Sequence, residues 1–229
     1  MAVLITGTSR GIGKALLEAY RASGRRTITI SRGEGIRVDR DGQHIYIRFA
    51  WDDFTSLAEA LHELSEAEGF KIESVINNAG VLIKDLISDV SYADFEEQMR
   101  VNVWYALELF RALYNKKLLA PNAHILNLGS MGGVQGSMKF PGLFAYSASK
   151  AALVGLTESL DAEYGGEGLA FNCLALGAVN TEMLKEAFPG YISEVDPENM
   201  AKFIQRVADE FGGVMSGKLI QASKSNPDA

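Results

Sequence analysis

A short apolar run that leads directly into glycines is the feature that most constrains how this chain can fold. Residues 2–5 (AVLI) have the composition of a buried strand, and the apolar spacing over 12–23 is that of a helix. Between them lies Thr6-Gly7-Thr8-Ser9-Arg10-Gly11-Ile12-Gly13, with glycines spaced G-x-x-x-G-x-G. Glycines let a backbone approach a pyrophosphate closely, and a helix N-terminus offers free N–H groups and a positive dipole end. This context favours dinucleotide binding over a glycine-rich turn without a ligand.

Strands and helices alternate along the rest of the chain, without an evident repeat or interdomain linker. The patterns predict strands at 27–31, 45–49, 72–76, 123–128, 169–175 and 218–222, and helices at 55–68, 92–119 (one or two), 145–164 and 197–211. This order predicts an α/β fold, in which a Rossmann-like, doubly wound parallel sheet carries helices on both faces. We expect a single domain over residues 1–229.

Composition disfavours several classes of protein. There are 22 Lys+Arg against 29 Asp+Glu, and the resulting net charge of −7 disfavours a nucleic-acid partner. The single Cys173 rules out an intramolecular disulfide and a Cys-based zinc site, and three histidines leave little for a metal site, so we expect no metal. No run reaches the about 20 apolar residues of a membrane span, and the N-terminus lacks the features of a signal peptide. We therefore expect a cytoplasmic protein with no membrane partner.

One predicted helix carries a pair of side chains suited to acid–base chemistry. Tyr146 and Lys150 lie four residues apart within 145–164 and therefore share a face. An ammonium near a phenol favours the phenolate and lowers the tyrosine pKa, which suits a general acid or base. An isolated Y-x-x-x-K is more often an ordinary surface pair. Likewise, Ser130 alone could cap a turn, and Asn102 could be a polar residue interrupting a helix.

Taken together, five segments in order resemble the short-chain dehydrogenase/reductase family of the classical type. They are T-G-x-x-x-G-x-G at 6–13, N-N-A-G at 77–80, Asn102 within V-N-V, Ser130 at the end of a strand, and Y-x-x-x-K at 146–150. The resemblance covers nearly the whole chain. It implies that Tyr146 exchanges the proton, Lys150 lowers its pKa and holds the nicotinamide ribose, Ser130 orients the substrate carbonyl, and Asn102 supports a water-linked proton relay.

The end of the second strand indicates which dinucleotide is bound. NAD-binding Rossmann proteins place an acidic residue there, whereas this chain has Ser31-Arg32. A guanidinium suits the 2′-phosphate of NADP, and Arg10 could form the other side of a clamp. We therefore expect NADP (NADPH) rather than NAD; the alternative is two solvent-exposed arginines. Asp52 resembles the aspartate that binds the adenine amino group, although the adjacent Asp53 is an alternative and could cap a helix.

The full set of cofactor-binding residues implied by the resemblance is Gly7, Ser9, Arg10, Gly11, Ile12, Gly13, Ser31, Arg32, Asp52, Asn78, Ala79, Gly80, Tyr146, Lys150, Gly177, Val179 and Thr181. Two segments depart from the family pattern. Leu176 stands where Pro-Gly is usual, before Gly177. Residues 33–44, where many members carry a full helix, are short, charged and glycine-containing, which predicts a turn or a small hairpin.

These observations predict an oxidoreductase that transfers a hydride between NADP(H) and a carbonyl or alcohol substrate. A nonenzymatic NADP-binding sensor or scaffold on the same fold is the alternative. A serine hydrolase lacks its G-x-S-x-G motif here, and an epimerase or dehydratase would need a larger C-terminal substrate domain. Candidate pocket residues are apolar and aromatic, but core packing explains such residues equally well: Met131, Phe140, Phe144, Met183, Leu184, Phe188 and Tyr191.

The helices predicted at 92–119 and 145–164 carry apolar residues on more than the one face that is needed to cover a sheet. Those in the first are Trp104, Leu107, Leu109, Phe110 and Leu113, and those in the second are Ala148, Leu153, Leu156 and Leu160. A further stripe needs another partner, and the family commonly pairs these helices around a two-fold axis. We therefore expect a homodimer or homotetramer; the alternative is that both stripes pack inside one subunit.

Overall fold

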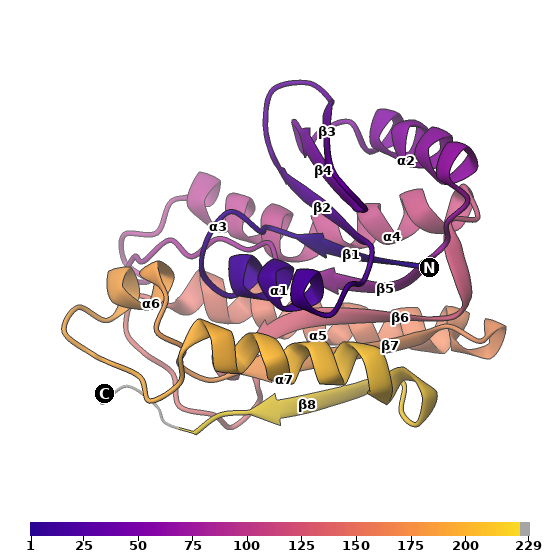
Figure 1. Ribbon diagram of the computed structural model, residues 1–229. Coiled ribbons are helices and arrows are strands. Elements are labelled where there is room, and N and C mark those ends of the chain that lie inside the picture. Colours follow the sequence, from indigo (N-terminus) through magenta and orange to yellow (C-terminus); the bar gives the residue numbers. More distant parts are fainter. Residues whose placement is uncertain (225–229) are drawn as a thin grey trace.

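The computed structural model describes residues 1–224 and has one eight-stranded sheet at its centre (Figure 1). The strands run in the order β3-β4-β2-β1-β5-β6-β7-β8. Their bounds are β1 Ala2–Thr6, β2 Thr27–Arg32, β3 Arg37–Asp41, β4 His44–Phe49, β5 Ile72–Asn77, β6 Leu119–Ser130, β7 Ala170–Leu176 and β8 Lys218–Ala222. Every pairing among them is parallel except that of β3 with β4. The predicted α/β fold class is confirmed.

Helices cover both faces of this sheet (Figure 1). They are α1 Gly11–Ala22, α2 Phe54–Glu68, α3 Tyr92–Met99, α4 Tyr105–Asn115, α5 Phe144–Tyr164, α6 Glu182–Ala187 and α7 Pro197–Glu210. One core cluster packs α1 and α7 on the sheet through side chains such as Leu16 and Ile204. The other packs α2, α4 and α5 on the opposite face, with Leu57, Leu109 and Leu160 in its centre. Within residues 1–224, no helix is long and apolar enough to cross a membrane.

The helix predicted over 92–119 is divided and ends early. A π-helix, Arg100–Trp104, separates α3 from α4. The prediction that helix continues to 119 is wrong, because Lys117 takes a left-handed conformation (φ 53°) and Leu118 donates its N–H to the carbonyl of Leu113 at 2.9 Å. The chain then enters β6 four residues earlier than predicted, at Leu119.

Most apolar residues of the two helices expected at an oligomer interface are buried in the chain's own core. Leu109, Phe110, Leu113, Leu153 and Leu160 are buried, whereas Trp104 is half exposed. This packing supports the alternative that the apolar faces pack inside one subunit. The homodimer or homotetramer remains a prediction, for which Trp104 offers the most exposed side chain, while Leu107, Ala148 and Leu156 are half-buried.

The segment between the second and third parallel strands is a hairpin rather than a helix. β3 pairs antiparallel with β4, and Gly42 supplies a positive φ of 59° in the turn between them. Ile45, Ile47 and Phe49 are buried in the core on the α2 side. The small hairpin predicted as one form of the 33–44 segment is therefore the one observed.

Candidate active site

The motif segments meet at the carboxyl end of the parallel strands. β1 leads into the glycine-rich loop, β5 into Asn78-Ala79-Gly80, β6 ends at Ser130, and β7 leads into Gly177. In open parallel sheets, ligands bind outside this end of the strands. The strand order places β1 between β2 and β5, so the glycine-rich loop adjoins both the end of β2 and the N-N-A-G segment.

The glycine-rich loop is shaped so that side chains could not occupy it. Gly7 has a φ of 72°, and a β-carbon there would lie 2.8 Å from the Cα of Ala79. A β-carbon on Gly13 would lie 2.1 Å from the carbonyl oxygen of Gly7. At the N-cap of α1, the Arg10 side chain makes no capping hydrogen bond within the described residues. Bare backbone in front of a helix N-terminus fits the pyrophosphate of a dinucleotide.

Asn78 holds this loop in place. Its Nδ2 donates to the carbonyl oxygens of Thr6 (2.9 Å) and Gly7 (2.8 Å). In return, the Thr6 hydroxyl accepts from the N–H groups of Asn78 (3.0 Å) and Ala79 (2.9 Å). Asn78, predicted as a cofactor-binding residue, therefore also supports the loop that would carry the cofactor.

Asn102 lies in the π-helix and is buried. Its Oδ1 accepts from the N–H of Val81 at 2.8 Å, and its Nδ2 donates to the carbonyl of Val81 and to the Ser149 hydroxyl, both at 2.9 Å. A β-carbon on Gly80 would lie 3.1 Å from Asn102 Oδ1 and 3.5 Å from Lys150 Nζ. The structure thus brings Asn102 and Lys150 to the same glycine.

Ser130, Tyr146 and Lys150 form the centre of the site. Ser130 is hydrogen-bonded to the Tyr146 side chain, and its Oγ also accepts from the N–H of Gly132 at 3.2 Å. Lys150 Nζ lies 5.8 Å from the centroid of the Tyr146 ring and donates to the carbonyl of Leu128 at 2.8 Å. Ser130 therefore makes the turn-capping hydrogen bond considered from the sequence, while its role in orienting a substrate carbonyl stays a prediction.

Burial controls the charge of both titrating groups. It lowers the pKa of Lys150 to about 8. It also raises the pKa of Tyr146, and the hydrogen bond with Ser130 offsets part of that rise. Desolvation of the phenolate is the larger of these two effects on Tyr146, and the lowering of its pKa by Lys150 that the sequence predicted stays a prediction.

The residues predicted to bind the adenosine end of the cofactor differ in their exposure and contacts. Ser31 is half-buried and Arg32 is exposed at the end of β2. Arg10 lies 3.7 Å from Glu186 of α6, and no contact within residues 1–224 joins it to Arg32. Asp52 is exposed, whereas Asp53 caps α2 by accepting from the N–H of Ser56 at 3.0 Å, as its alternative reading predicted.

The loop after β7 closes against the glycine-rich loop. Thr181 caps α6 by accepting from the N–H of Leu184 at 3.2 Å, and its Cγ2 lies 3.3 Å from where a β-carbon on Gly11 would be. Gly177 donates its N–H to the carbonyl of Ala222 at 2.9 Å, and Val179 is buried. Despite Leu176 in place of proline, this loop therefore reaches the site.

Two residues that hold parts of the site in place were not predicted from the sequence. Ser149 was visible only as a serine inside Y-S-A-S-K, yet it accepts a hydrogen bond from Asn102. Lys84 donates to the carbonyl of Ala187 at 2.7 Å and lies 5.8 Å from the Phe188 ring centroid. Lys84 thereby links the loop after β5 to α6, and no spacing in the sequence indicated that contact.

Of the seven candidate pocket residues, three are engaged in aromatic pairs. Phe140 packs edge-on against Phe188, with ring centroids 4.9 Å apart, and Phe144 stacks on Phe95 at 6.0 Å. Met183 and Leu184 lie in α6, next to Thr181. These apolar groups gather on the segments that follow the strands' carboxyl ends.

Comparisons with known proteins agree with this architecture. A family model described as short chain dehydrogenase matches residues 1–191. The chain is 30% identical over 218 residues to Oxidoreductase UcpA of Salmonella typhimurium (strain LT2), covering 90% of this chain and 81% of that protein.

Solved structures share the fold over nearly the full length. A short-chain dehydrogenase from Burkholderia cenocepacia in complex with NADP has a TM-score of 0.79 and 22% identity, covering 96% of this chain and 95% of that one. A 4-hydroxyisoleucine dehydrogenase complexed with NADH has a TM-score of 0.75 and 20% identity, covering 97% and 96%. With the matching family model and the motifs gathered at one end of the sheet, these findings show that the chain belongs to the short-chain dehydrogenase family.

Proposed function

We propose that this protein is an NADP(H)-dependent reductase that interconverts carbonyl and alcohol groups, with Tyr146 as the general acid and base. The observation that carries the proposal is the Ser130–Tyr146–Lys150 arrangement, in which Lys150 is buried and the other two side chains are half-buried, beside the bare glycine backbone at the carboxyl end of the sheet. We propose that residues 1–229 form one domain that carries this site. A pure binding module would have no need of an acid beside a binding loop.

The glycine-rich loop and the α1 N-terminus would hold the pyrophosphate, and Lys150 would contact the nicotinamide ribose. When bound, the dinucleotide supplies the hydride. In reduction, the Tyr146 hydroxyl donates its proton to the oxygen of the developing alkoxide, while Ser130 donates a hydrogen bond to the same oxygen. Because burial raises the tyrosine pKa, the phenol is protonated at neutral pH, which is the form that reduction requires.

Lys150 and Asn102 would support that proton transfer. A lysine whose pKa is about 8 still carries its charge at pH 7 and can stabilise the phenolate left after the transfer. The side chain of Asn102 is occupied by Val81 and Ser149, so a part in the relay falls to its backbone carbonyl. The π-helix favours that part, because its altered hydrogen bonding frees backbone groups at functional sites.

The preference for NADP over NAD rests on the end of β2. Ser31 and Arg32 offer a hydroxyl and a guanidinium where an acidic side chain would repel a phosphate. Relatives of this fold include complexes with either dinucleotide, so the choice depends on this chain's own residues. The apolar groups around Phe140 and Phe188 favour a partly apolar substrate.

Replacing Tyr146 tests the proposal. The wild-type protein would be screened for NADPH consumption with a panel of aldehydes and ketones. Tyr146→Phe keeps the ring and removes the proton donor, so turnover should fall by about 10²-fold or more. NADPH affinity, measured by fluorescence titration, should stay nearly unchanged.

The matched control is Tyr164→Phe, the same change at the far end of α5, where the ring packs on Phe110 and Tyr114. It should leave turnover intact. A Tyr146→Phe variant with near wild-type turnover would remove the acid–base assignment. A wild-type protein that binds NADPH but reduces nothing in the panel would favour the sensor or scaffold instead.

A further inference from the structure

We propose that the β3–β4 hairpin supplies Arg48 and Arg37 as a second set of ligands for the 2′-phosphate of NADP, opposite Ser31. This inference rests on the proposed NADP preference and extends it to residues outside the glycine-rich loop and the β2 end. The hairpin stands where many relatives have a helix. The residues that face the site are therefore identified from the pairing of its strands.

The register of three strands places these side chains in one row. Ser31 of β2 pairs with Arg48 of β4, and Arg48 pairs with Arg37 of β3. Side chains of paired residues project from the same face of a sheet, and neighbouring strands lie about 4.8 Å apart. A phosphate bound at Ser31 would therefore lie within reach of the long Arg48 side chain, with Arg37 one strand further away.

The row lies on the face of the sheet that α1 covers. Further down the same strands, Thr27 Oγ1 and His44 Nδ1 are 2.8 Å apart, and Arg21 of α1 contacts Asp41 and lies 5.7 Å from the Tyr46 ring centroid. Every second residue of a strand projects from the same face, so Ser31, Arg48 and Arg37 lie on this face as well. The glycine-rich loop begins beside it, because Gly7 donates its N–H to the carbonyl of Ile30 at 2.8 Å.

Gly33 fixes the base of the Arg48 side chain. The N–H of Gly33 donates to the carbonyl of Phe49 at 3.1 Å, so the chain leaving β2 lies across the end of β4. A β-carbon on Gly33 would lie 2.7 Å from the β-carbon of Arg48. Glycine at this position therefore lets the backbone pack directly on Arg48 and leaves the guanidinium as the part free to move.

The charge around the row is positive and not fully paired. Arg48 donates to Asp39 at 2.8 Å, while Arg32 and Arg37 form no ion pair within residues 1–224. Glu34 is the other carboxylate near the row, because Asp41 lies at the far end of the hairpin and pairs with Arg21. The guanidinium groups of Arg32, Arg37 and Arg48 outnumber the two carboxylates of Glu34 and Asp39. The row therefore has a net positive charge, and guanidinium groups bind phosphate oxygens through pairs of N–H donors.

Binding of two fragments that differ only in the 2′-phosphate tests this assignment without any turnover. Isothermal titration would compare adenosine 2′,5′-bisphosphate with 5′-AMP on the wild-type protein and on Arg48→Gln. We expect Arg48→Gln to weaken binding of the bisphosphate about tenfold or more, as expected for loss of a charged hydrogen bond, and to leave 5′-AMP unchanged. Arg37→Gln should weaken the bisphosphate in the same selective way, to a smaller extent.

The matched control is Arg40→Gln in the same hairpin. Arg40 pairs with Ile45, so it belongs to the other face, where it donates to Glu68 at 3.1 Å. It should change the binding of neither fragment. If the wild-type protein prefers the bisphosphate and both Arg48→Gln and Arg37→Gln retain that preference, the hairpin assignment is overturned while the proposed NADP preference stands. If the wild-type protein binds both fragments equally, the NADP preference itself fails, and the hairpin assignment with it.

Discussion

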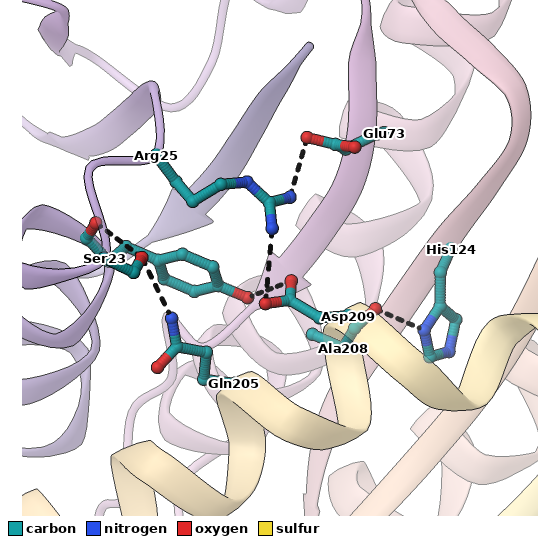
Figure 2. A network of polar contacts seen from close by, with 8 residues as sticks. Ser23, Arg25, Glu73, His124, Gln205, Ala208 and Asp209 are labelled. Atoms are coloured by element: carbon teal, nitrogen blue, oxygen red, sulfur yellow. Dashed lines mark hydrogen bonds and ion pairs between the residues drawn. The ribbon is translucent and has the colours of Figure 1, made fainter.

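The two ends of the sheet use polar side chains in opposite ways. At the amino end, Tyr20 of α1 donates to Asp209 of α7 at 3.0 Å. Arg25 joins Asp209 to Glu73 of β5 (Figure 2). At the carboxyl end, the loops leave bare backbone and exposed arginines around a half-buried tyrosine and a buried lysine. The first arrangement satisfies its charges internally and ties α1 to α7. The second keeps its charges for a ligand, so we expect it to contribute less to stability.

Lys150→Met tests this difference most strongly. Turnover should fall by about 10²-fold or more, because the phenolate of Tyr146 loses its cation. Yet burial lowers the pKa of Lys150 to about 8, so the folded state holds its charge less readily than the unfolded state does. Removing that charge should leave the melting temperature at neutral pH unchanged or higher, even though the hydrogen bond to Leu128 is lost.

Calorimetry and a turnover assay on the same preparation give both values for Lys150→Met. A variant that loses activity and also melts well below the wild-type protein would show that the lysine stabilises the fold. The carboxyl end of the sheet would then contribute to stability through Lys150, contrary to the difference drawn between the two ends.

Tyr20→Phe makes the corresponding change at the amino end. Tyr20 is fully buried, and burial together with Asp209 raises its pKa. Removing the hydroxyl leaves the half-buried Asp209 carboxylate with Arg25 at 3.5 Å, which should lower the free energy of unfolding by about 1–3 kcal/mol. Urea denaturation measures the loss. NADPH affinity should not change, and a weakened affinity would mean that the two ends are coupled.

The sequence predicted the fold better than it predicted the contacts of the site. The strand–glycine–helix start, the hairpin and the alternation of strands and helices along the chain follow from local patterns of apolar residues and glycines, which act within a few neighbours. The bond from Asn102 to Ser149 and the bridge from Lys84 to Ala187 join residues 47 and 103 positions apart. No local spacing encodes such contacts, because they depend on how α5 and α6 are placed over the loops.

Electrostatics was the least predictable part of the site. The i,i+4 spacing of Tyr146 and Lys150 indicated a shared helix face but not how strongly each group is desolvated. Desolvation is the main cause of the raised tyrosine pKa. Arg10 shows the same limit: nothing in the sequence indicated its contact with Glu186, and its place near the NADP phosphate stays a prediction.

The smallest expected effect is a pH dependence of stability that arises from His124, which lies next to the polar contacts at the amino end of the sheet. His124 is buried; its Nδ1 donates to the carbonyl of Ala208 at 3.0 Å (Figure 2), and its Nε2 accepts from Asn172 at 3.0 Å. A proton on Nε2 would face the donor group of Asn172, and burial lowers the pKa of His124. The unfolded chain therefore binds more protons below the ordinary histidine pKa, so stability should fall as the pH drops through about 6.5.

His124→Gln should reduce that loss, by at most the slope of one proton, about 1.4 kcal/mol per pH unit. Free energies of unfolding measured between pH 7 and pH 5 would show it. His44→Gln is the matched comparison, because burial also lowers the pKa of His44 but that side chain is only half-buried, so its contribution to the slope should be smaller. Parallel pH profiles for the wild-type protein and His124→Gln would contradict this prediction. They would mean that His124 has the same pKa in the folded and the unfolded protein, so that its hydrogen bonds to Ala208 and Asn172 do not disfavour the charged imidazole.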